Sequence, residues 1–203
     1  DLTTRHTRTS QQADHVMMMQ PQSDMAIANG IAHELLVRDA WAKEFVASHC
    51  NFRGPGEPAT LLGEAIDFEQ YRAAMSEYTP EKVSQTSGLS IDQLKLLADV
   101  FANPKLKVTS LWCMGMNQHT QGTAINNLVH GVHLLSGHWG RLGDGPQSLT
   151  GQPSACGTVR EVGTLAHALP GDLKVEDPHH REIAEKLWRL PAGRINPQPG
   201  HHT

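Results

Sequence analysis

The stretch LWCMGMNQHTQGTAINNLVHGVHLLSG, residues Leu111–Gly137, decides the fold class that we predict for this chain. An apolar run over Lys107–Met114 is typical of a buried strand, and it stops at a loop rich in Met, Asn, Gln and Gly. Helical spacing follows over Thr123–Leu135, and Gly137 is a typical C-terminal stop. A buried strand followed by a loop and a helix is the repeating unit of α/β proteins.

The same order of elements appears near the start of the chain. Ala13–Met19 is a second predicted strand, Gln20–Asp24 is a turn with Asp24 as helix N-cap, and the apolar spacing from Met25 to Leu36 is helical. Further helices are predicted at Trp41–Ser48, Phe68–Tyr78, Pro80–Thr86, Ser90–Ala102 and Asp177–Pro191, with connections over Cys50–Ala65 and His138–Ser154. We therefore predict an α/β fold with a mostly parallel sheet flanked by helices.

Composition excludes several classes of function. The 203 residues carry a net charge of -4 with no basic stripe, which argues against a nucleic-acid partner. No apolar run approaches the roughly 18 residues that a membrane span needs. The three cysteines, Cys50, Cys113 and Cys156, are widely spaced and form no C-x-x-C pair, so a disulfide framework, a zinc site or an iron–sulfur cluster within this segment is not expected.

Uncharged amides stand at the ends of both predicted strands. In open parallel sheets, ligands bind beyond the carboxyl ends of the strands, where helix N-termini suit an anion such as a pyrophosphate. Gln22, Asn117 and Gln118 offer donors and acceptors for the edge of a purine- or pterin-like ring, and Met114 could pack on such a ring. The alternative is that these amides only cap helices and close turns.

Arg160 and the histidines are the remaining candidates for chemistry. Arg160 lies in a long loop and could hold an oxyanion bidentately, or it could form an ordinary salt bridge with Glu161 or Asp144. Among the 13 histidines, His130 and His133 share a helix face, but no third ligand stands nearby. We therefore predict no metal ligands in this segment.

Four motifs resemble a known family. They are MGMNQHTQG from Met114, NNLVHGVHLLSG from Asn126, SLTGQPSACGTVREVG from Ser148 and HREIAEKLWRLPAGRINPQPGHHT from His180. In this order and spacing they resemble the catalytic subunits of periplasmic nitrate reductases, within the dimethyl sulfoxide reductase family of molybdenum enzymes. The likeness extends from Thr3 to Thr203. Members are several times longer, and this chain opens on Asp1, so we expect an internal fragment of a larger multidomain enzyme.

The resemblance implies a reaction and its cofactors. The expected reaction is the reduction of nitrate to nitrite by two-electron oxygen-atom transfer, with molybdenum held by two molybdopterin guanine dinucleotides. The family's dinucleotide contacts fall on Thr3, Thr4, Arg5, His6, Thr7, Gln22, Ser23, Asp24, Met114 and Gln118. Arg160 falls on the arginine of the substrate funnel, where it would orient nitrate. The cysteines for molybdenum and for a [4Fe–4S] cluster lie upstream in the family, so the 203 residues alone are expected to be inactive.

The resemblance also implies an organisation and a setting. Residues 1–165 would form the dinucleotide-binding α/β region, with a helical insert at about 40–102, and residues 166–203 a loop and helix that continue into the next part of the enzyme. A periplasmic location and a haem-containing electron-transfer subunit are expected from the family. The alternatives are an assimilatory nitrate reductase, a formate dehydrogenase of the same superfamily, and a non-catalytic homologue that serves as a structural or binding module.

Overall fold

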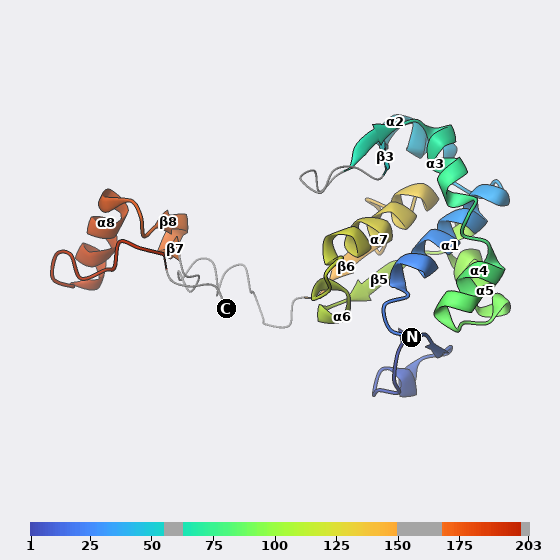
Figure 1. Ribbon diagram of the computed structural model, residues 1–203, viewed down its shortest axis with the longest axis horizontal. Coiled ribbons are helices and arrows are strands. Elements are labelled where there is room, and N and C mark those ends of the chain that lie inside the picture. The colour runs from blue at the N-terminus through green and yellow to red at the C-terminus, as the bar shows by residue number, and fades with distance from the viewer. Residues whose placement is uncertain (55–62, 150–167, 200–203) are drawn as a thin grey trace. The chain divides into compact units, whose positions relative to one another are not determined.

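The computed structural model describes residues 1–54, 63–149 and 168–199. The chain divides into two compact units, Asp1–Ser148 and Leu149–Thr203, which are coloured blue to yellow and red in Figure 1. The domain boundary predicted after residue 165 lies outside the described residues. Each unit is described by itself.

Helices make up most of the first unit. In chain order they are α1 (Asp24–Val37), α2 (Lys43–His49), α3 (Phe68–Met75), α4 (Pro80–Ser87), α5 (Ile91–Ala102), α6 (Met114–Asn117) and α7 (Gly122–Ser136). Helix α1 lies between α7 on one side and α4 with α5 on the other (Figure 1). It therefore forms the centre of the core, and Leu35 and Leu36 on it are almost fully buried. Each such side chain stabilises the fold by about 1.5–3 kcal/mol.

The strands form short, separate pairs. β1 (Leu2–Thr3) pairs in parallel with β2 (Met17–Met18), and β5 (Thr109–Trp112) pairs in parallel with β6 (Gly145–Ser148). β3 (Phe52–Gly54) and β4 (Glu64–Ile66) form an antiparallel pair within the predicted Gly/Pro-rich connection. The predicted α/β class is confirmed, and the two predicted strands, now β2 and β5, both belong to parallel pairs. The described strands form short separate pairs, of which β3–β4 is antiparallel, in place of one mostly parallel sheet.

Local capping explains where the helices begin. The predicted capping box at α5 is present, because Ser90 Oγ accepts from Gln93 N and Gln93 Oε1 accepts from Ser90 N. At α1 the prediction of Asp24 as N-cap is wrong, since Asp24 is the first helical residue and Ser23 precedes it as N-cap. The Ser23 hydroxyl donates instead to the Gln20 carbonyl at 2.7 Å, so it fastens the turn after β2.

The second unit is a small α/β cluster. β7 (Ala168–Leu169) and β8 (Leu173–Lys174) are antiparallel, and α8 (Pro178–Trp188) packs on them through Ala184. The predicted helix over Asp177–Pro191 is thus confirmed, with Asp177 as its N-cap and its end at Trp188. Across the described parts of both units, no helix is long and apolar enough to cross a membrane.

Candidate functional site: a cavity between two strand ends

The carboxyl ends of β2 and β5 open onto one cavity of about 750 Å³ in the first unit. Three segments that are far apart in the sequence line it: the N-terminal segment, the junction of β2 with α1, and the junction of β5 with α6. Its apolar floor comes from α1, α5 and α7, through Ile27, Ile31, Leu97, Phe101, Val129 and Val132. The structure therefore brings the two predicted strand ends to one cavity, although β2 and β5 belong to separate strand pairs.

Four of the predicted cofactor contacts lie in the cavity wall. These are Thr3 and Thr4 from the N-terminal segment, and Gln22 and Asp24 from the start of α1. Gln22 is exposed and has a φ of 66°, a left-handed conformation that costs an ordinary residue about 1–2 kcal/mol. Backbone strain of this kind is concentrated at functional sites. Ser23, by contrast, is buried behind the wall.

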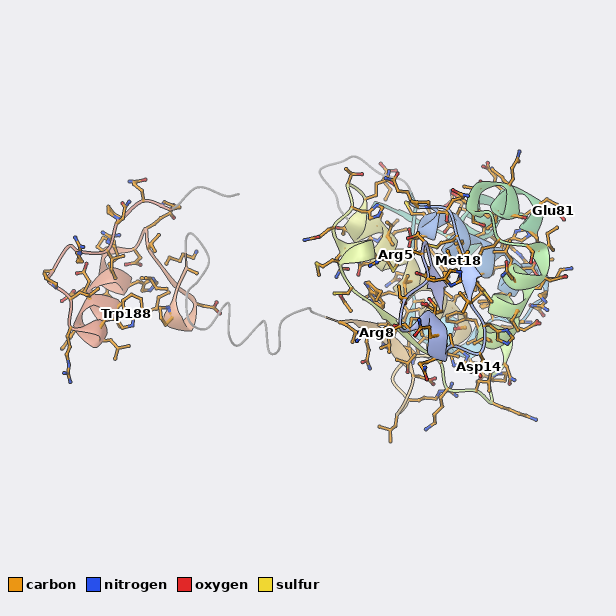
Figure 2. All side chains as sticks on the ribbon, turned by 90° about the horizontal axis from the view of Figure 1, so that it is seen from below. Arg5, Arg8, Asp14, Met18, Glu81 and Trp188 are labelled. Atoms are coloured by element: carbon orange, nitrogen blue, oxygen red, sulfur yellow. The ribbon has the colours of Figure 1, made fainter. Side chains whose placement is uncertain are left out.

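The rest of the N-terminal contact set does not line the cavity. Arg5 and His6 are exposed, and Arg5 is labelled in Figure 2 on the blue N-terminal segment. Thr7 turns inward toward Ser10, whose Oγ accepts a hydrogen bond from Thr7 N at 3.0 Å. Thr7 thus closes a local turn. Of the predicted cofactor contacts Thr3–Thr7, only Thr3 and Thr4 line the cavity.

The loop after β5 contributes to the wall through residues adjacent to those predicted. Cys113, Gly115, Met116 and His119 line the cavity, whereas Met114, on the short helix α6, and Gln118, directly after that helix, are exposed and do not line it. Sequence patterns could not decide which residues of this loop face the cavity. In a helical turn, neighbouring side chains point about 100° apart, so a shift of one residue changes which side chain lines the wall.

The Asn117 side chain fastens this loop to the rest of the unit. Its Oδ1 accepts from Trp112 Nε1 at 3.0 Å and from Asn126 Nδ2 at 3.0 Å, and its Nδ2 donates to Ser148 Oγ at 2.8 Å. The alternative that the amide closes a turn therefore describes Asn117 better than contact with a ring.

A buried polar group behind β5 was not predicted. Asp144 is fully buried as a side chain, and its Oδ1 accepts from Val108 N at 2.6 Å while its Oδ2 accepts from Arg141 Nε at 2.5 Å. Burial acts to raise the pKa of Asp144, but the hydrogen bonds from Val108 and Arg141 outweigh it and lower the pKa. The bond from Val108 N thus tethers the loop before β6 to the residue that precedes β5, and the ion pair with Arg141 holds the Asp144 carboxylate within that loop.

Two histidines extend this group toward the cavity. His133 Nδ1 donates to the His138 carbonyl at 3.1 Å, which leaves Nε2 of a neutral ring to accept from Ser110 Oγ at 2.8 Å. Burial lowers the pKa of His133 and favours that neutral ring. His138 Nε2 donates to the Phe101 carbonyl at 3.1 Å. Because Ser110 and Phe101 line the cavity, these bonds hold its floor in place.

The other residues considered for catalysis or metal binding are Arg160, the cysteines and the histidines. Arg160 and Cys156 lie outside the described residues. His133 is a buried, hydrogen-bonded histidine. Over residues 1–54, 63–149 and 168–199, no cluster of three or more His, Cys, Asp or Glu side chains could hold a metal ion.

Comparison with known proteins supports the fold. No family model matches the chain. Among solved structures, acetylene hydratase from Pelobacter acetylenicus is similar over 67% of this chain, with a TM-score of 0.54 and 19% sequence identity. The chain spans 16% of that enzyme's length. At this identity the likeness shows a shared α/β fold.

Proposed function

We propose that this chain is part of a molybdenum-dependent nitrate reductase, in which the 750 Å³ cavity binds one end of a molybdopterin guanine dinucleotide. One observation carries the proposal. The segments Thr3–Thr4, Gln22–Asp24 and the loop after β5, which the motif resemblance connects with this cofactor, enclose a single cavity. The volume lies in the range of about 300–1,000 Å³ that is usual for small-molecule and cofactor sites.

The residues of the cavity fit the guanosine end of such a cofactor. Guanine presents two adjacent N–H donors, and the Asp24 carboxylate in the wall is an acceptor for both. The neighbouring Gln22 amide can donate to a ring oxygen or nitrogen, while Ile27 and Ile31 offer an apolar surface for the ring. The described part of the wall contains no Lys or Arg, so the diphosphate would be neutralised by groups outside it.

The other roles follow from the same proposal. The molybdenum centre would supply the redox chemistry, and the protein would supply position and electrostatic field. Arg160 would attract nitrate and favour the negative charge that develops on the transferred oxygen. A periplasmic setting, an upstream [4Fe–4S] cluster and a haem-containing electron donor belong to the proposal through the motif resemblance.

The test uses the full-length protein produced with molybdate. We expect nitrate-dependent oxidation of a reduced viologen dye, no formate-dependent dye reduction, and loss of nitrate turnover in Arg160→Ala. Formate turnover without nitrate turnover would assign the chain to the formate dehydrogenases and remove the role given to Arg160. Absence of both activities in a protein that contains the pterin would favour the non-catalytic homologue.

A further inference from the structure

A second cleft, of about 400 Å³, lies in the first unit and shares only Ala28 and Val132 with the wall of the proposed cofactor site. It is formed by α1, α2, β3, α3 and α7, of which α1 and α7 lie side by side (Figure 1). Apolar side chains make up much of its wall, among them Val46, Phe52, Leu128 and Leu135. Its size and apolar wall match those of small-molecule sites.

Three polar side chains reach this cleft from three different helices. They are Asn29 on α1, Tyr71 on α3 and His130 on α7, and Asn29 is only 6% exposed. Within the described residues, none of the three makes a side-chain hydrogen bond, and their polar atoms keep some accessible surface. Tyr71 and His130 are half-buried, whereas Asn29 is buried, and a buried amide nearly always has a hydrogen-bond partner.

All three polar groups are uncharged near neutral pH. Burial raises the pKa of Tyr71 to about 12 and lowers the pKa of His130. Burial also raises the pKa of the Cys50 thiol in the same wall. Arg53 is the only charged side chain in the described wall, and it is exposed. A strongly charged ligand would therefore lose its hydration without gaining a buried partner.

Aromatic rings give the cleft a flat, rigid side. The ring centroids of Phe52 and Tyr71 are 4.8 Å apart, with 36° between the ring planes. His130 is held edge-on between Trp112, at 5.8 Å, and Trp139, at 5.7 Å. Rings fixed in this way present ready-made faces and edges to a planar ligand.

We propose that this cleft binds an uncharged, ring-sized organic molecule with an amide-like edge that carries both a hydrogen-bond donor and an acceptor. The Asn29 amide pairs with that edge, since it offers the complementary donor and acceptor. Tyr71 and His130 supply further bonds at its rim, and the ring packs against Phe52. None of these three polar side chains lines the nucleotide cavity, and the ligand class differs from a dinucleotide in size and charge.

The test uses benzamide as the probe, titrated into the full-length protein and followed by ligand-observed NMR. Benzamide combines a planar ring with an amide edge, and benzoate has the same ring with a negative charge. We expect saturable benzamide binding and at least tenfold weaker benzoate binding. Loss of one neutral hydrogen bond in Tyr71→Phe should raise the benzamide Kd about three- to tenfold.

Two variants separate the site from general effects on folding. Tyr78→Phe alters the chain's other tyrosine, which does not line the cleft, and should leave the Kd unchanged. Asn29→Leu keeps the side-chain size and should abolish benzamide binding, with circular dichroism reporting that the fold is kept. The proposal is wrong if benzamide does not saturate, if benzoate binds more tightly, or if Tyr71→Phe and Tyr78→Phe behave alike.

Discussion

Replacing Asp144 by Ala tests the account of how the floor of the cavity is held. The variant removes the acceptor of Val108 N, which is 2.6 Å from Asp144 Oδ1, and the partner of Arg141. A hydrogen bond to a charged group contributes about 1.5–3 kcal/mol. The Arg141 pair adds less than about 1 kcal/mol, since 47% of that side chain is exposed. Together these contributions sum to about 1.5–4 kcal/mol, and we take the middle of that range, about 2–3 kcal/mol, as the expected loss of local stability at β5.

Hydrogen exchange measured by mass spectrometry reports this local stability directly. At about 1.4 kcal/mol for each tenfold change, the protection of the segment that contains β5 should fall about 30- to 150-fold. The matched control is Asp99→Ala, which removes a surface ion pair with Arg38 and should change protection by less than about fivefold. If protection of the β5 segment in Asp144→Ala changes by less than threefold, or if protection falls equally over the whole first unit, Asp144 does not hold the loop to β5.

Three further predictions concern other parts of the chain. Asp24→Asn should lower the amount of molybdopterin cofactor that the purified full-length protein retains by tenfold or more, measured as the guanine nucleotide released from it. Asp14→Asn, at an exposed position labelled in Figure 2, should leave that amount unchanged. Gly137→Ala should destabilise α7 by about 2 kcal/mol in hydrogen exchange, because φ is +74° and the new Cβ would lie 2.7 Å from a neighbouring methyl group. Its control, Gly131→Ala, has open space and should stabilise α7 by about 0.5–1 kcal/mol. The Glu185 carboxylate has a lowered pKa because it accepts hydrogen bonds from backbone N–H groups. Its contribution to the stability of the second unit should therefore be full above the unfolded pKa of about 4.3, and it should be lost as pH falls through the lower folded pKa. Trp188 fluorescence should report a loss of structure in that pH range, and a Glu185→Gln variant should show no such transition.

The helices could be predicted because their signals are local. The capping box at Ser90 and Gln93 and the left-handed Gly137 after α7 involve residues within one turn of each other. The strands depend on partners that are distant in the sequence. β6 contains Gly145 and Pro146, which read as turn formers, and it is a strand because β5 offers a parallel edge.

The sequence predicted where the cavity lies better than which residues line it. The general rule for strand ends placed Gln22 at the cavity, and Asp24 joins it there through the motif resemblance. The role of Asn117 as a fastener depends on Ser148, which is 31 residues away, and no sequence pattern connects the two. The same holds for the bonds of Ser110, His133 and Asp144, which meet only after β5, α7 and β6 have packed.

The most direct measurement is a structure of the full-length protein purified with its cofactor. The account predicts density for a guanosine inside the 750 Å³ cavity, with its ring edge against Asp24 and its face near Ile27 and Ile31. A cofactor bound elsewhere, with this cavity filled by another part of the polypeptide, would contradict the central claim.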